Sequence, residues 1–149
     1  MDELDRRILA AWATDARRSL RDIAAEVGVS ATTVHDRARA LQRSGLIRGS
    51  YLDLDLVQLG RGVQALIAVR IRPPSRNNIE AFRDWVGNLP ETVGVFVTSG
   101  RSDFILHVAV PDNEALYSFV IDRLTSRAEI ADVETSIIYE HMRASSPIV

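Results

Sequence analysis

Cysteine is absent from this chain of 149 residues, which excludes disulfide bonds, zinc sites with thiolate ligands and cysteine nucleophiles. Lysine is absent too, so all eighteen basic residues are arginine. No apolar run approaches the roughly 18 residues needed to cross a bilayer, and the acidic start, residues 1–5, does not resemble a signal peptide. Hydrophobic residues make up 46% of the chain, which favours a folded protein. We therefore expect a soluble, cytoplasmic protein with no membrane partner.

Positive charge is concentrated in the first third of the chain. Residues 1–50 hold nine arginines and seven acids, a net charge of +2, whereas residues 51–149 hold nine arginines and thirteen acids, a net charge of −4. Within residues 30–48 there are four arginines and a single acid, Asp36. A local positive stretch in an acidic protein is typical of a surface that binds nucleic acid. A solvated helix face in a small bundle is the alternative interpretation.

The spacing of apolar residues predicts three helices within residues 1–50. The first runs from after Asp2 to about Ala13, with apolar side chains every four residues. The second begins at a capping-box pattern, residues 19–22, and ends at Gly28, since glycine tolerates the left-handed conformation of a helix stop. Ser30 is the expected N-cap of the third helix, which buries Val34, Ala38 and Leu41 and ends at residues 44–45. Two helices joined by a short glycine turn predict a helix-turn-helix, winged-helix-like domain that reads double-stranded DNA with its second helix.

The third predicted helix carries the candidate DNA-binding residues. If Val34 is the centre of the buried face, four side chains point away from it and two flank them; the four are Thr32, Asp36, Arg39 and Arg43, and the flanking pair is Thr33 and His35. Threonine can contact base edges or a thymine methyl group, and arginine can donate two hydrogen bonds to guanine, as we expect of Arg39. Arg43 and Arg48 lie farther along and are expected at phosphates, and Ser30 lies at a helix N-terminus, which favours an anion. Arg37 is nearer the buried edge, where it either clamps a phosphate or pairs with an acid of the first helix.

The remainder of the chain predicts a second domain of β-α-β-β-α-β order. The expected strands are residues 63–72, 93–99, 104–110 and 130–139, and the expected helices are residues 78–89 and 113–126. This is the ferredoxin-like pattern, so the fold class is α+β. Alternating apolar residues before it predict a linker strand, giving a helix-turn-helix domain over 1–50, a linker over 51–61 and a ferredoxin-like domain over 62–149. The three histidines have no metal-ligand spacing and no catalytic motif is present, so we expect neither an enzyme nor a cofactor.

The ordered set of motifs resembles the Lrp/AsnC (leucine-responsive regulatory protein) family of prokaryotic transcription regulators. The similar segments run through both domains: Leu4–Leu9, Asp15–Arg17, Ile23–Ala24, Val27–Ser30, Thr33–Val34, Arg37, Leu41, Gly45–Ile47, Gly49, Leu59–Gly60, Ser99–Phe104 and Thr135–Ile138. The sequence departs from the family pattern at Leu56, where many members have proline, and at Glu129, where many have glycine. Leu56 and Glu129 lie in predicted connections, so these departures bear on the local shape of a turn and not on function. The role of residues 143–149 is left open.

The resemblance implies self-association and a small-molecule effector. Both faces of the predicted sheet are apolar, whereas two helices cover only one, so the second face is expected to pair with another copy; the family forms dimers that often assemble to octamers. The family's effector pocket, typically for an amino acid, borders a turn like the one here, which predicts effector contacts from Thr98, Ser99, Gly100, Arg101 and Asp103. Asp103 would accept from an α-ammonium group and Arg101 would hold a carboxylate. The alternative interpretation is that Gly-x-x-Asp is only a good hairpin turn.

Two other functions remain compatible with the sequence. Siroheme decarboxylases resemble this family in fold, but an enzyme of that kind needs no basic recognition face. An architectural nucleoid protein would bind DNA with little sequence preference and with steep salt dependence. A transcription regulator modulated by an amino acid is the interpretation that we favour.

Overall fold

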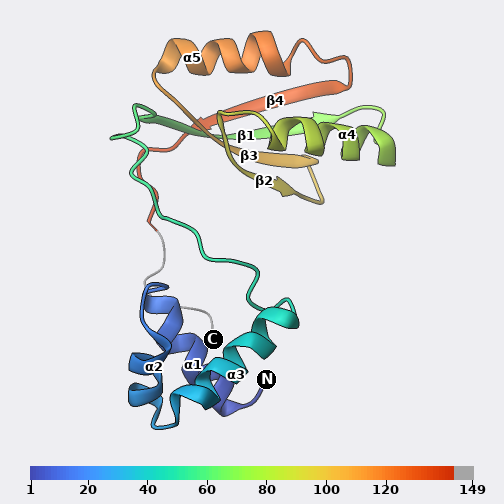
Figure 1. The fold of residues 1–149 in the computed structure, drawn as a ribbon. Helices are drawn as coiled ribbons and strands as arrows, with labels where there is room; N and C mark the ends of the chain where they lie inside the picture. Colours follow the sequence, from blue (N-terminus) through green and yellow to red (C-terminus); the bar gives the residue numbers. More distant parts are fainter. Residues whose placement is uncertain (143–149) are drawn as a thin grey trace. The chain divides into compact units, whose positions relative to one another are not determined.

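The computed structural model describes residues 1–142; the segment 143–149 lies outside the described residues. The chain divides between Asp53 and Leu54 into two compact units, the first of residues 1–53 and the second of residues 54–141 (Figure 1). Each unit has its own hydrophobic core. None of the described helices is long and apolar enough to cross a membrane.

The first unit consists of three helices, as the sequence predicts: α1 (Glu3–Thr14), α2 (Leu20–Val27) and α3 (Ala31–Arg43). Each begins at a residue whose side-chain oxygen accepts a backbone N–H of the first turn, namely Asp2, Ser19 and Ser30. Apolar side chains from all three helices form the core; the buried ones are Ile8, Ala11, Ile23, Ala24, Val27 and Val34. The helices are short, so this shared core supplies most of their stability.

The second unit has the ferredoxin-like fold, which confirms the predicted class. Its elements are β1 (Val63–Ile71), α4 (Arg76–Gly87), β2 (Thr92–Val97), β3 (Phe104–Val110), α5 (Asn113–Ser118), the π-helical continuation η1 (Phe119–Leu124) and β4 (Ile130–Ile137). The four strands form one antiparallel sheet in the order β2-β3-β1-β4 (Figure 1). α4 begins two residues before the predicted start because Ser75 caps it.

The two faces of this sheet differ in what covers them. On the inner face, alternate residues of β1 and β3 are fully buried against α4, α5 and η1; they are Ala65, Ile67, Val69, Ile71, Phe104, Leu106 and Val108. On the outer face, large apolar side chains are exposed to solvent; Leu66 and Phe96 are 40% and 57% exposed. The two-sided apolar pattern predicted from the sequence is therefore present, with one side uncovered in the single chain.

The predicted linker strand over residues 51–61 does not form, and no strand lies between α3 and β1 in the described range, so the helical unit has no β-wing there. Leu52 and Leu54 alternate with polar residues, but an extended segment needs a partner for its backbone groups, and the sheet contains only the four strands given above. Asp55 instead starts a turn: its Oδ1 accepts from the backbone N–H of Val57 at 2.9 Å and of Gln58 at 3.1 Å. The turn ends at Gly60, whose φ is 74°.

Candidate nucleic-acid interface and effector pocket

The turn between α2 and α3 is built from a left-handed glycine and a serine cap. Gly28 has φ 75° and ψ 35°, and its N–H donates to the Ala24 carbonyl, so α2 stops there. Two residues later, Ser30 Oγ accepts from the Thr33 N–H at 3.1 Å and lies 2.7 Å from Thr33 Oγ1. The hydroxyl of Thr33 is therefore held within the cap, while the adjacent Thr32 is exposed.

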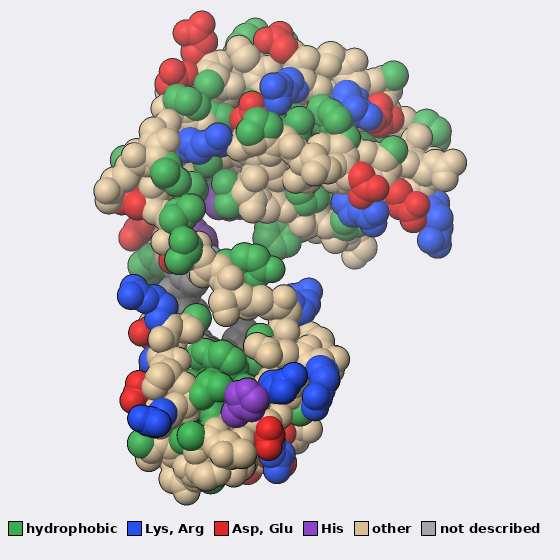
Figure 2. Space-filling view, viewed as in Figure 1, with side chains coloured by type: hydrophobic (Ala, Val, Ile, Leu, Met, Phe, Trp, Pro, Cys, Tyr) green, Lys and Arg blue, Asp and Glu red, His purple; other side chains and the backbone are tan. Residues whose placement is uncertain are grey.

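The exposure of side chains along α3 agrees with the predicted orientation of the helix. Val34, Ala38 and Leu41 are buried and form one ridge. Exposed polar and charged residues occupy the rest of the helix and the segment after it: Thr32, His35, Asp36, Arg39, Arg43 and Arg48. Arginine side chains lie on both flanks of the helical unit in Figure 2, with several close together on one of them. This arrangement offers an accessible cationic surface without disturbing the core.

The arginines of the helical unit fall into two groups. Some are engaged within the unit: Arg7 Nη2 donates to the Val27 carbonyl at 3.0 Å, and Arg18 Nη2 pairs with Glu26 at 2.5 Å. In contrast, no ion pair among residues 1–142 involves Arg39, Arg43 or Arg48. Arg39, Arg43 and Arg48 therefore keep their charge available for a ligand such as phosphate.

Arg37 belongs to the first group. Its Nη1 lies 2.5 Å from Asp2 Oδ2 and 3.2 Å from Asp5 Oδ1, so the expected alternative of pairing with an acid of the first helix is confirmed. The N–H of Asp5 and the guanidinium of Arg37 lower the pKa of Asp2, and Asp2 together with Asp5 raises the pKa of Arg37.

The predicted effector residues cluster at the turn between β2 and β3. Gly100 has φ 118°, a conformation that side-chain-bearing residues rarely adopt. Thr98 Oγ1 donates to the Ser102 carbonyl at 2.7 Å, while Ser99 and Arg101 are exposed. The Arg101 carbonyl accepts from Arg70 Nε at 2.9 Å, which ties the turn to β1. The Arg101 guanidinium projects into solvent, 80% exposed, with Glu134 3.9 Å away.

Asp103 is more constrained than its neighbours in the turn. Its Oδ2 accepts from the Ile71 N–H at 2.7 Å, and the guanidinium of Arg72 lies 3.7 Å from the same oxygen. The side chain therefore binds the end of β1, whereas a simple hairpin-turn aspartate would bind its own backbone. One carboxylate oxygen is committed to this contact.

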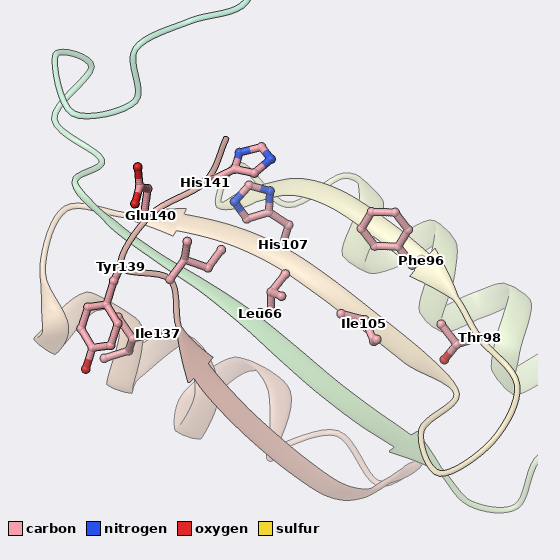
Figure 3. A pocket seen from close by; sticks show the side chains of 10 residues that line it. Leu66, Phe96, Thr98, Ile105, His107, Ile137, Tyr139, Glu140 and His141 are labelled. Carbon is pink, nitrogen blue, oxygen red and sulfur yellow. The ribbon is translucent and has the colours of Figure 1, made fainter. Parts of the chain in front are cut away.

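A hollow of about 760 Å³ lies on the outer face of the sheet. Figure 3 shows apolar side chains from three strands at its base and polar groups at one end. The lining residues are Leu66, Phe96, Thr98, Ile105, His107, Ile137, Ile138, Tyr139, Glu140 and His141. Of the predicted effector residues only Thr98 lines the hollow. The apolar base of the hollow was predictable from the alternation of apolar residues on β1 and β3. The lining residues that follow β4 belong to no sequence motif and could not be predicted.

His107 is the polar centre of this hollow. Its Nε2 lies 2.9 Å from Gln64 Oε1, and its ring meets that of His141 edge-on with 5.8 Å between centroids. Partial burial, and secondarily the charge of His141, lower the pKa of His107. The histidine is therefore hydrogen-bonded on a partly buried face.

Comparisons with known proteins match a family model to each of the two units. Residues 1–42 match the model of the AsnC-type helix-turn-helix domain, and residues 64–148 match that of the Lrp/AsnC ligand binding domain. The chain belongs to the Lrp/AsnC family. It is similar to the HTH-type transcriptional regulator AldR of Mycolicibacterium smegmatis, with 40% identity over 99% of this chain and 86% of that protein.

Solved structures of this family support the fold and the class of function. The crystal structure of MtbAldR is 37% identical with a TM-score of 0.77, covering 99% of this chain and 100% of the other. A transcriptional regulator of Neisseria meningitidis, solved as a complex with L-Met, is 26% identical with a TM-score of 0.90, covering 99% and 97%. The relatives are transcriptional regulators and not enzymes, so this Lrp/AsnC chain is a DNA-binding transcription regulator and the decarboxylase alternative is excluded.

Proposed function

We propose that this Lrp/AsnC regulator binds double-stranded DNA sequence-specifically, with α3 in the major groove, and that it acts in the cytoplasm. The observation that carries the proposal is the division of α3 into a buried apolar ridge and an exposed face with threonine and with arginines that form no ion pair among residues 1–142. Thr32 is the best-placed threonine for base edges, because the Thr33 hydroxyl is engaged by Ser30. Arg39 is proposed at a base edge, and Arg43 and Arg48 at phosphates. Ser30, Thr33, His35 and Asp36 border this face.

Two matched variants test the groove orientation. Genomic fragments that the protein retains are selected, and their affinity is compared with that of a random duplex of equal length at several salt concentrations. Arg43→Met should weaken binding to the selected fragments and to the random duplex alike. It should also lower the slope of log affinity against log salt by about 0.9, because one phosphate contact is lost. Thr32→Val should instead change base preference. If both variants lose affinity without a change in preference, α3 does not lie in the groove as proposed. If the wild type itself fails to discriminate between the two duplexes, the architectural nucleoid function takes its place.

An amino acid is the proposed effector, bound at a subunit interface near residues 98–103. The relative solved with L-Met supports this ligand class, and the left-handed backbone at Gly100 allows a ligand close approach to the turn. Arg101 is exposed and suits a carboxylate. Asp103 has one oxygen committed to Ile71, so the other is the proposed acceptor for an α-ammonium group.

Calorimetry with a panel of amino acids, L-Met included, distinguishes the turn from the hollow. Asp103→Asn keeps an oxygen for the Ile71 N–H but removes the charge, so it should weaken binding about ten-fold or more. Glu140→Gln removes the charged group of the hollow and should leave affinity unchanged. The opposite pattern places the ligand in the hollow, and no heat with any amino acid rejects this effector class.

We further propose that the outer sheet face pairs two copies in a homodimer, which assembles to an octamer. An exposed apolar patch of this kind is uncommon in monomers, and a two-fold dimer would present two copies of α3 to half-sites about one DNA turn apart. Light scattering after size-exclusion chromatography measures the mass. A monomer at micromolar concentration would reject the dimer, and a dimer that gains no further mass on concentration would reject the octamer.

A further inference from the structure

Three side chains connect the start of α1 to the middle of α3. Asp2 Oδ1 accepts from the Asp5 N–H at 2.9 Å, and Asp5 Oδ2 accepts from the Asp2 N–H at 2.9 Å, which is a reciprocal capping box. The remaining oxygen of each carboxylate faces the same guanidinium nitrogen, Nη1 of Arg37. The helix cap and the ion pair are therefore one network.

Asp5 makes this network more than a surface ion pair. It is 6% exposed and is the only buried charged residue in the part of the chain that the structure describes. A buried carboxylate without a cationic partner is unfavourable, because burial removes its hydration. Arg37 meets that need from beside the buried ridge of α3, with its own side chain 41% exposed. The pairing thus links the middle of α3 to the start of α1.

The charge of the network also separates Arg37 from the other arginines of α3. Two carboxylates surround one guanidinium, so the three side chains together carry a charge of −1 and offer no excess positive charge to a phosphate. Arg43 lies six residues farther along the same helix and is in no ion pair among residues 1–142. Only a cation that is not already neutralised releases counterions when it meets a phosphate.

We infer that Arg37, held by Asp2 and Asp5, is a positioning residue that fixes the orientation of α3 for base recognition and does not itself bind phosphate. The inference rests on the proposed function, since it takes α3 as the element that reads the groove. It predicts that loss of the network lowers discrimination between sequences while leaving the salt dependence of binding unchanged.

The test uses the full chain and the two duplexes described above, a selected genomic fragment and a random duplex. The variants are Arg37→Met, Asp2→Asn and their double variant, with Arg43→Met as the matched control from the same helix. Asparagine remains a good N-cap, so Asp2→Asn removes the ion pair of Asp2 with Arg37, leaves that of Asp5 with Arg37, and retains the cap even if Arg37→Met folds poorly. Thermal unfolding of each variant sets an assay temperature well below its transition.

On the random duplex, Arg43→Met should lower the salt slope by about 0.9, whereas Arg37→Met should leave it unchanged. The affinity ratio of selected to random duplex should fall about ten-fold in Arg37→Met and by less in Asp2→Asn, which keeps the ion pair of Asp5 with Arg37. The double variant should fall no further than Arg37→Met, since Asp2 acts through Arg37. A salt slope that falls equally in Arg37→Met and Arg43→Met makes Arg37 a phosphate ligand and overturns the inference. An unchanged affinity ratio in both single variants overturns it as well. Failure of the wild type to prefer the selected fragment counts instead against the proposed function.

Discussion

Asp103 and Ile71 are joined by a hydrogen bond from the Ile71 N–H to Asp103 Oδ2, with 2.7 Å between nitrogen and oxygen. The regular pairing of β1 with β3 ends at Val69 and Phe104, and the pairing of β1 with β4 shifts register between Arg70 and Ile71. The carboxylate therefore supplies an acceptor where the sheet has none. Asp103, which is proposed to bind an effector, therefore also stabilises the end of β1 beside the proposed effector site.

Asp103→Ala should destabilise the ligand-binding domain by about 2 kcal/mol, because it leaves the N–H of the fully buried Ile71 without its acceptor. Asp103→Asn should cost clearly less, since the amide oxygen can still accept. Urea unfolding followed by the fluorescence of Trp85, in a Trp12→Phe background, reports on this unit alone. Equal losses in the two variants would show that the carboxylate charge, and not the acceptor, stabilises this end of β1.

Much of the fold was predictable because its signals are local. The period of Val34, Ala38 and Leu41, the caps at Ser19 and Ser30, and the stop at Gly28 each depend on a few neighbouring residues. The exposed face of α3 follows from the same periodicity, so most candidate DNA-binding residues could be placed correctly at the surface.

Features that depend on distant partners were not predictable. Leu52 and Leu54 alternate like a strand, but within residues 1–142 no strand pairs with them. The partner of Asp103 lies thirty-two residues earlier in the chain. For Arg37 the sequence permitted both a phosphate and an acid, and only the packing of α1 against α3 decided between them.

Ser30→Ala should destabilise the helical unit by about 1 kcal/mol, because the Thr33 N–H loses its cap. Ser19 caps α2 with the same geometry, accepting from the Asp22 N–H at 3.1 Å, so Ser19→Ala is a matched control with a similar cost. If Ser30 also contacts DNA, Ser30→Ala should lose more DNA affinity than Ser19→Ala at equal stability. Equal affinities would limit Ser30 to the capping role.

Acid should destabilise the ligand-binding domain through His107. Burial, then the charge of His141, lower its pKa in the folded state below the ordinary value of 6.5. The unfolded chain consequently takes up the proton first as the pH falls through 6.5, so this contribution to stability is complete above that value and is lost progressively below it. Tyr139, Glu140 and His141 are the other titratable groups lining the hollow around His107.

The pH effect is measured by urea unfolding of the Trp85-only protein between pH 7.5 and pH 5.5. His107→Gln keeps a hydrogen-bonding group near Gln64 and should flatten the acid loss over this range. His35→Gln, on the exposed face of α3 in the other unit, should leave the loss unchanged. An acid loss that persists in His107→Gln would assign it to other groups.

A charge on the outer sheet face should dissociate the proposed dimer. Leu66 and Phe96 are exposed in the single chain, so Leu66→Arg or Phe96→Arg removes little from the core of the unit. In a two-fold interface each substitution occurs twice, and burying unpaired guanidinium groups against an apolar face is strongly unfavourable. Light scattering should then give the mass of one chain.

Tyr117→Arg, at a residue of α5 that is 66% exposed, is the matched control and should retain the mass of the wild type. Dissociation by Tyr117→Arg but not by Leu66→Arg would move the interface to the helical side, because only the face that receives the charge can lose its partner.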